Sequence, residues 1–215
     1  MRPLMDEAVA LFERASGHTI DVQYRLTSVL AKEIEAGVAF DIALMPRPEL
    51  DALVRTGKVA AGSETDMTRS AVGVAVREGA PKPDITTVDA FKRMLRQART
   101  IAYSDGPSGL YIAGLLERLG LAEAMKPKTR LTTGPVAELV ARGEAEIGLQ
   151  QIVAILPVKG AELAGPLPEE LQNIIVYAAG ISPRSPNAAA ARACVAFMAT
   201  PEVARIIRAK GMEPG

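Results

Sequence analysis

Residues 26–46, LTSVLAKEIEAGVAFDIALMP, contain one complete helix-and-strand unit. Thr27 and Ser28 are typical helix N-caps, and apolar residues then recur at helical spacing until Gly37, which predicts the end of the helix. Residues 41–45 (DIALM) follow as a short buried strand that a proline ends. The order of this unit, a capped helix and then an apolar strand, is typical of α/β proteins.

The same alternation extends from this unit toward both ends of the chain. Further helices are expected at residues 2–16, 48–56, 87–97, 110–119, 136–142, 187–199 and 201–210. Further strands are expected at residues 19–24, 70–77, 100–104, 128–131, 146–150 and 174–179. Strands that are joined by crossover helices predict an α/β fold with parallel sheets covered on both faces.

The composition excludes several classes of function. Lys plus Arg and Asp plus Glu both number 25, so the chain lacks the excess of cations that a nucleic-acid binder needs. Trp is absent, and four Tyr and four Phe are too few for a binding surface built on stacked aromatic rings. No segment approaches the roughly 20 apolar residues of a membrane span, so membrane insertion is not expected.

Cysteine and histidine are too rare for a metal centre. Cys194 is the only cysteine and His18 the only histidine, which excludes an internal disulfide and a His/Cys zinc site. Cys194 falls on an apolar stripe and is expected in the core, while His18 lies in a turn and is expected at the surface. The sequence therefore predicts no metal, no cofactor and no catalytic residue.

Three polar turns follow predicted strands and open predicted helices. They are residues 24–28 (YRLTS), 104–109 (SDGPSG) and 131–134 (LTTG). Ligands of open α/β sheets bind at such junctions. Hydroxyls, free backbone N–H groups and helix dipoles would together suit an oxyanion there. The alternative is that the hydroxyls only cap their helices.

Four charged or phenolic side chains lie beside these turns or another strand end. Arg25 and Arg47 each follow a strand, where a guanidinium can clamp a carboxylate; the alternative is a solvated surface charge. Asp105 and Tyr111 are the titratable groups next to the expected pocket loops, where a general base would have to lie. An Asp before Gly-Pro is also a common turn residue.

Four segments resemble, in order, motifs of the periplasmic molybdate-binding proteins of ABC transporters. They are residues 26–46, 107–121 (PSGLYIAGLLERLGL), 139–149 (LVARGEAEIGL) and 199–214 (ATPEVARIIRAKGMEP). The resemblance implies a two-lobed type II periplasmic-binding-protein fold, with two mixed, mostly parallel sheets and an interlobe cleft. Lobe one would be residues 1–72 plus 173–215, and lobe two residues 73–172.

The resemblance also implies a binding site. Gln151 stands at the position of the family's binding tyrosine, and Ser108 and Thr133 stand where backbone N–H groups bind. This departure and Arg25 favour the branch of the family that binds organic anions and contains aconitate isomerase. The expected ligand-binding residues are Arg25, Thr27, Ser28, Pro107, Ser108, Gly109, Thr132, Thr133 and Gln151.

The function implied by the resemblance is capture of a small anion, a carboxylate or an oxyanion such as molybdate, for ABC-type transport. A membrane subunit of the transporter is the expected partner, and the periplasm is the expected location. The alternative is an aconitate isomerase-like enzyme that moves a proton on an unsaturated tricarboxylate. A cytoplasmic ligand sensor is a third interpretation, because residues 1–3 lead straight into a helix.

The family fold places a strand before its first helix, whereas residues 2–16 already form that helix here. In the resembling fold the strand lies between segments 19–24 and 41–45. We therefore expect one of three outcomes: the two segments pair directly, another chain supplies the strand, or the 215-residue form has low stability.

Overall fold

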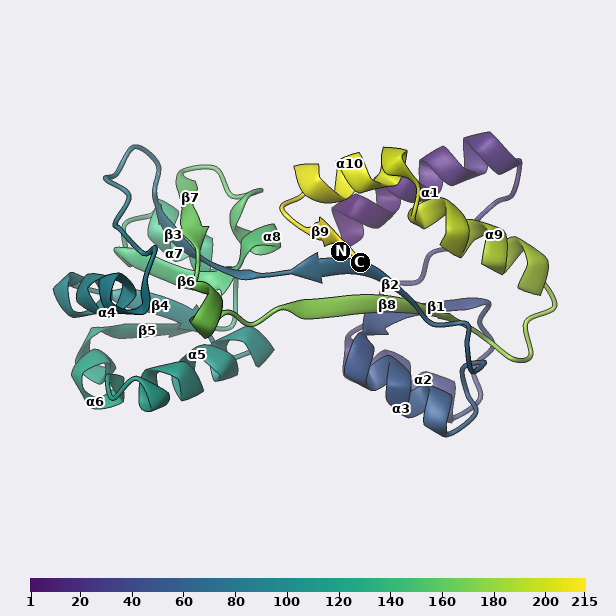
Figure 1. The fold of residues 1–215 in the computed structure, drawn as a ribbon, viewed down its shortest axis with the longest axis horizontal. Helices are drawn as coiled ribbons and strands as arrows, with labels where there is room; N and C mark the ends of the chain where they lie inside the picture. Colours follow the sequence, from purple (N-terminus) through teal and green to yellow (C-terminus); the bar gives the residue numbers. More distant parts are fainter. The chain divides into compact units, whose positions relative to one another are not determined.

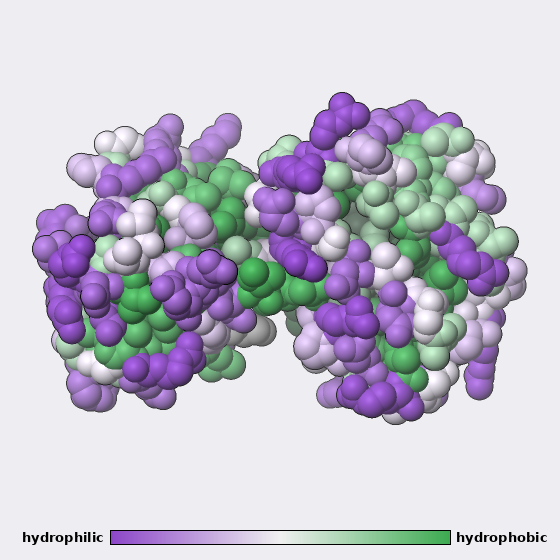
Figure 2. All heavy atoms as spheres, in the orientation of Figure 1, coloured by the Kyte–Doolittle hydropathy of each residue, from purple (hydrophilic) through white to green (hydrophobic). Residues whose placement is uncertain are grey.

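Two α/β units make up the computed structural model, which describes residues 1–215 except for the side chain of Pro107. Unit 1 comprises Met1–Arg69 and Ile175–Gly215, and unit 2 comprises Ser70–Ile174. Each unit has its own sheet with helices on both sides (Figure 1). Figure 2 shows hydrophilic residues over much of the visible face of each unit.

Unit 1 contains a four-stranded sheet in the order β1-β8-β2-β9. Its strands are β1 (Ile42–Pro46), β2 (Thr65–Ser70), β8 (Ile175–Ile181) and β9 (Glu213–Pro214). Its helices are α1 (Arg2–Ser16), α2 (Thr27–Glu35), α3 (Arg47–Arg55), α9 (Ala188–Met198) and α10 (Pro201–Ala209). Helices α2 and α3 cover one face of the sheet, and α1, α9 and α10 pack together on the other (Figure 1).

Along β1, buried residues that pack with α3 alternate with half-buried ones. Ala43 and Met45 are buried and pack with Leu50 of α3, while their neighbours in β1 are only half-buried. Gly180 of β8 leaves room for Leu50, because a Cβ there would lie 3.1 Å from Leu50 Cδ1, and also 2.6 Å from Cγ1 of Val59, which follows α3. The sheet therefore accepts the helix where its own side chains are smallest.

Unit 2 contains a five-stranded sheet in the order β5-β4-β6-β3-β7. Its strands are β3 (Val72–Arg77), β4 (Ile101–Ser104), β5 (Thr129–Thr132), β6 (Ile147–Gln151) and β7 (Ala161–Pro166). Its helices are α4 (Val88–Gln97), α5 (Pro107–Arg118), α6 (Ala122–Met125), α7 (Val136–Ala141) and α8 (Ile152–Ile155). The first three helices share one apolar cluster with the sheet, and α7 and α8 share another.

Side-chain size differs between the two faces of this sheet. Large residues face α4, α5 and α6, whereas small residues face α7 and α8. The large ones are Val72, Val74, Val76, Ile101, Ile147 and Leu149, and the small ones are Ala75, Ala102 and Gly148. A Cβ on Gly148 would lie 2.8 Å from Cγ2 of Val140, so the small residues let α7 lie close against the strands.

The sheet of unit 2 is mixed, as expected, whereas the strand pairs described in unit 1 are antiparallel, so the fold is less parallel than expected. Strand β4 runs parallel to β5 and β6. The pairs β1–β8, β2–β9, β3–β6 and β3–β7 are antiparallel. Two strands are not predicted from the sequence. Strand β2 (TDMTRS) is mostly polar, and β7 (AELAGP) contains Gly and Pro, so neither has a continuous β-rich pattern.

The predicted strand at residues 19–24 is wrong. In the part of the chain that the structure describes, no strand and no backbone–backbone hydrogen bond involves Thr19–Arg25. The backbone N–H of Ile20 instead donates to the Glu13 carboxylate at 2.8 Å. A β-rich sequence forms a strand only beside another strand, so direct pairing of this segment with β1, the first of the three outcomes, is wrong as well.

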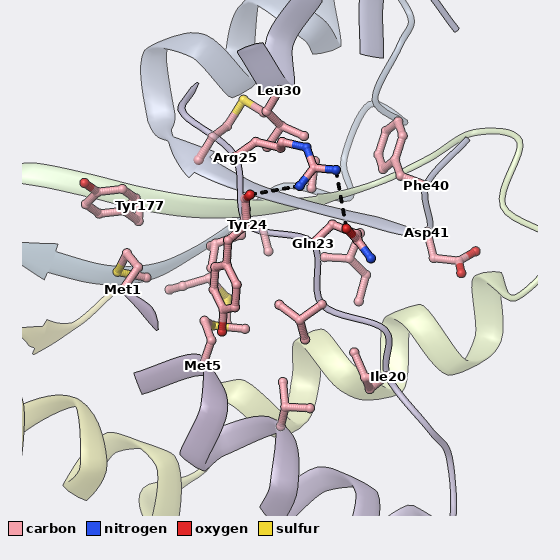
Figure 3. A pocket seen from close by; sticks show the side chains of 18 of the residues that line it. Met1, Met5, Ile20, Gln23, Tyr24, Arg25, Leu30, Phe40, Asp41 and Tyr177 are labelled. Carbon is pink, nitrogen blue, oxygen red and sulfur yellow. Dashed lines mark hydrogen bonds between the residues drawn. The ribbon is translucent and has the colours of Figure 1, made fainter. Parts of the chain in front are cut away.

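A groove of about 850 Å³ lies beside this segment in unit 1. It is lined by residues 19–27, by residues 38–45 with the outer edge of β1, and by α1 residues such as Met5 (Figure 3). Most of its lining side chains are apolar, and β1 is the last strand on this side of the sheet. The groove thus combines apolar walls with a free strand edge, which together suit an added strand.

Helix α5 starts directly against the end of β4. A Cβ on Gly109, in the first turn of α5, would overlap the backbone carbonyl of Ser104. The absence of a side chain at this position therefore sets how closely the start of α5 approaches the carboxyl end of β4.

We expect a short β-branched extension before Met1 to raise the melting temperature. It would add a strand beside β1, and each backbone hydrogen bond gained contributes about 0.5–1.5 kcal/mol. It would also convert the Met1 ammonium, whose pKa burial lowers, into an uncharged amide. Thermal unfolding followed by circular dichroism tests this. A Gly/Pro-rich extension of equal length is the control, and equal melting temperatures for all three chains would contradict the expectation.

We expect Gly109→Ala to lower the free energy of unfolding by about 1–3 kcal/mol, because the new methyl group meets backbone that cannot rotate away. Gly114→Ala on the same helix is the matched control. Its nearest neighbour would be the Arg118 guanidinium at 4.0 Å, so it should stabilise α5 by up to about 1 kcal/mol. Urea unfolding of both variants measures the difference, and a neutral Gly109→Ala would disprove the close approach.

Candidate functional site

A cavity of about 300 Å³ in unit 2 gathers the polar ends of three neighbouring strands. Strand β4 lies between β5 and β6 and is parallel to both, so the carboxyl ends of all three meet at one edge of the sheet. Ligands of α/β sheets bind at such an edge. The lining residues are Ser104, Asp105, Gly106, Ser108, Thr133, Gly134, Pro135, Gln150, Gln151 and Ala154.

The loop from β4 to α5 supplies backbone and hydroxyl groups to this cavity. The Asp105 N–H donates to the Thr132 carbonyl at 3.1 Å, which ties the loop to β5. Gly106 is the N-cap of α5, and Ser108 is the second residue of the helix, within its first turn. The capping interpretation of Ser108 is therefore wrong. Pro107 starts α5, and its side chain lies outside the described part of the structure.

The loop from β5 to α7 contributes Thr133. The Thr132 hydroxyl accepts a hydrogen bond from the Gly134 N–H at 2.9 Å and so stabilises the turn rather than lining the cavity. Pro135 is the N-cap of α7, so Thr133 does not cap this helix either. The exposed Thr133 is left beside the cavity as a hydrogen-bonding side chain.

Strand β6 ends in two carboxamides. Gln151 was expected at the site; its Oε1 lies 3.5 Å from the Ser70 hydroxyl, which donates to it. Gln150 was not expected, although it lines the same cavity and only 4% of it is exposed. The signal that could have revealed it is a second amide directly following the apolar part of a buried strand, IGLQQ.

The structure therefore brings Ser108, Thr133 and Gln151 together in unit 2. Gly109 is buried behind them against Ser104 and does not line the cavity among the described residues. No Lys, Arg or His is present in the described lining, and Asp105 is its one ionisable side chain. A ligand here would meet neutral hydrogen-bond donors and the N-terminal end of the twelve-residue helix α5.

The expected residues of the first turn lie in unit 1. Arg25 and Thr27 line the 850 Å³ groove, while Ser28 lines neither cavity in the described structure. Leu26 is the N-cap of α2, so the expected capping by Thr27 or Ser28 is wrong. Arg25 and Thr27 belong to unit 1 and Ser108 to unit 2, and their convergence on one cleft stays a prediction.

The Arg25 guanidinium makes local contacts (Figure 3). It donates to the Tyr24 carbonyl at 3.0 Å and to Gln23 Oε1 at 3.4 Å, and its Nε lies 3.6 Å from a Glu33 carboxylate oxygen. Its side chain is 41% exposed, so solvent screens this ion pair. Arg47 is more tightly held, by Asp51 at 2.7 Å and Asp66 at 2.8 Å.

Two tyrosines near the expected loops are engaged elsewhere. The Tyr111 hydroxyl donates to the Leu171 carbonyl at 2.9 Å, and Tyr111 does not line the cavity of unit 2 among the described residues. In unit 1, desolvation and a 2.5 Å hydrogen bond to Asp6 raise the pKa of Tyr24 to about 12, so this phenol stays neutral at physiological pH. Of the two expected base candidates, only Asp105 lines the cavity.

The expected positions of Cys194 in the core and of His18 at the surface are confirmed. Cys194 is a buried free thiol whose pKa is raised by burial. His18 is exposed, and the centre of its ring lies 6.0 Å from that of the Phe12 ring, on which it stacks.

No group of three metal-ligating side chains occurs among the described residues. No helix in the described chain combines the length and the apolar character needed to cross a membrane.

Two curated relatives are similar to the chain along nearly all of its length. The aconitate isomerase of Pseudomonas sp. is 34% identical over 215 residues, which cover 97% of this chain and 82% of that protein. The molybdate-binding protein ModA of Rhodobacter capsulatus is 29% identical over 214 residues, which cover 95% of this chain and 81% of that protein.

A solved structure gives the same fold. The substrate-binding domain assigned to a molybdenum ABC transporter of Clostridium difficile matches with a TM-score of 0.87 and 16% identity, over 100% of this chain and 94% of that one. The expected type II periplasmic-binding fold is thus confirmed.

The profile of a family described as "Bacterial extracellular solute-binding protein" matches residues 1–213. The chain therefore belongs to the bacterial extracellular solute-binding protein family.

Proposed function

We propose that this solute-binding protein captures a small organic anion, a carboxylate, and delivers it to the membrane subunit of an ABC transporter from the periplasm. The observation that carries this proposal is the cavity of unit 2. Its neutral hydrogen-bond donors and the start of α5 suit the oxygen atoms of an anion, and its volume of about 300 Å³ suits a small one.

The Asp105 side chain favours an organic acid over molybdate. A fully ionised tetrahedral oxyanion would place its charge beside this carboxylate, which costs energy in a partly enclosed site. A hydroxy acid such as citrate can instead donate a hydrogen bond from its hydroxyl to Asp105. The similarity to an aconitate isomerase supports the same choice.

A thermal-shift screen tests the proposal directly, with trans-aconitate, cis-aconitate, citrate, molybdate and sulfate as probes. A ligand at 100 times its Kd stabilises a protein by about 2.7 kcal/mol, which gives a clear rise in melting temperature. We expect a rise with at least one carboxylate and none with molybdate. A rise in melting temperature with molybdate alone would show that the ligand is an oxyanion and not an organic anion. No rise with any probe would contradict the proposal.

We expect Ser108→Ala and Thr133→Ala each to weaken binding of the carboxylate that responds in this screen, because each removes one hydroxyl donor. Loss of a hydrogen bond to a charged group costs about 1.5–3 kcal/mol, which corresponds to roughly a 10- to 150-fold rise in Kd. Isothermal titration calorimetry measures the change. Thr86→Ala is the control, since this hydroxyl is bonded to Asp84 outside the cavity.

Arg25→Ala extends the same calorimetry to unit 1. If the guanidinium clamps the carboxylate, its removal also weakens binding by about 1.5–3 kcal/mol. The exposed Arg205→Ala controls for the lost charge. Equal affinities for the Arg25 and Arg205 variants would assign Arg25 to the solvated surface, and would leave the site in unit 2 unaffected.

The second candidate function is an isomerase of unsaturated tricarboxylates. It is favoured by the 34% identity to the aconitate isomerase of Pseudomonas sp. and by Asp105, whose carboxylate is a candidate base at the cavity. Conversion of cis- to trans-aconitate followed by proton NMR tests it. Turnover that Asp105→Asn abolishes without loss of aconitate binding would establish the enzyme, and binding without turnover would exclude this reaction.

A further inference from the structure

The side-chain carboxamide of Gln150 in unit 2 has one polar atom with a hydrogen-bond partner and one without. Its Oε1 accepts a hydrogen bond from the Val136 N–H at 2.7 Å. Its Nε2 is buried and has no hydrogen-bond partner in the described structure. The residue is 96% buried, since 4% of it is exposed. A buried donor without a partner destabilises the folded chain, so this amide is maintained against a penalty.

The orientation of this amide is fixed by its neighbours. A flipped carboxamide would turn its NH₂ group toward the Val136 N–H and place two donors against each other. The backbone of Gln150 is also fixed, because it pairs with Gly73 in the antiparallel ladder between β6 and β3. The free Nε2–H is therefore a preorganised donor rather than one end of a rotating side chain.

Gln150 lines the cavity beside Ser104, Ser108 and Thr133. We infer that Gln150 Nε2 donates a hydrogen bond to an oxygen of the bound anion and selects ligands with an acceptor at that point. This inference rests on the proposed function and deepens it, because it names a buried residue whose hydrogen bond contributes to ligand specificity. A carboxylate oxygen satisfies the donor, whereas the NH₂ group of the corresponding primary amide opposes it.

Substitution by glutamate separates this role from support of the fold. In Gln150→Glu, one carboxylate oxygen still accepts from the Val136 N–H, while the other replaces the donor with a negative charge. We expect the Kd for trans-aconitate to rise by about 10- to 150-fold, the range for a lost bond to a charged group. Gln97→Glu, at the exposed end of α4, is the matched control for the added charge and should bind like the native chain.

Side-chain NMR gives a readout in the native sequence, which does not depend on whether the variant folds. The two Gln150 side-chain NH₂ resonances, assigned in the native chain by sequential assignment and by nuclear Overhauser effects to the neighbouring Val136 N–H, should shift when trans-aconitate is added. Gln172 is the internal control, because its Nε2 already donates to the carbonyls of Val72 at 3.1 Å and Leu167 at 3.3 Å. Its resonances should stay in place.

The outcomes distinguish this inference from the proposed function. Binding by the native chain with unmoved Gln150 resonances, or with equal Kd in Gln150→Glu, overturns the role of Gln150 and leaves anion binding intact. No binding of trans-aconitate, citrate or molybdate to the native chain overturns both. Shifted Gln150 resonances together with a raised Kd in Gln150→Glu support the inference.

Discussion

The parallel pairing of β4 with β5 and β6 is the constraint on which the candidate site depends. Parallel neighbours end at the same edge of a sheet, so the loops after β4 and β5 and the end of β6 are brought together although more than 40 residues separate Ser104 from Gln150. Close packing preserves this geometry. Gly109 lets α5 begin against β4, and Gly148 lets α7 lie against β6.

The Ser108 and Thr133 side chains at this edge do not cap the helices that begin there. Gly106 and Pro135, rather than Ser108 and Thr133, are the N-caps of α5 and α7. The first N–H of α7 is instead satisfied by a side chain from β6, the Gln150 carboxamide. That arrangement leaves the Ser108 and Thr133 hydroxyls without a capping role and the Gln150 Nε2 without a partner, and all three residues line the cavity, whose described lining holds no lysine or arginine.

Local sequence patterns predicted most of the helices and the apolar strands. The amphipathic stripe that ends at Gly17, where φ is 73°, predicted α1, and DIALM predicted β1. Such patterns fail where a strand depends on its partner. Residues 19–24 are β-rich yet remain without a strand neighbour, whereas the polar β2 and β7 form strands because neighbours supply their hydrogen bonds.

The sequence by itself determined the order of most elements, the absence of a His/Cys metal centre, and the strand-to-helix junctions in which Ser108 and Thr133 lie, because spacing, composition and turn residues are local properties. Only the tertiary structure decided the direction of each strand and the residues that cap α2, α5 and α7. It also decided that Gln150 is buried with a free donor. Burial and hydrogen-bond satisfaction depend on contacts between distant segments, here Gln150 with Val136, and no local pattern specifies them.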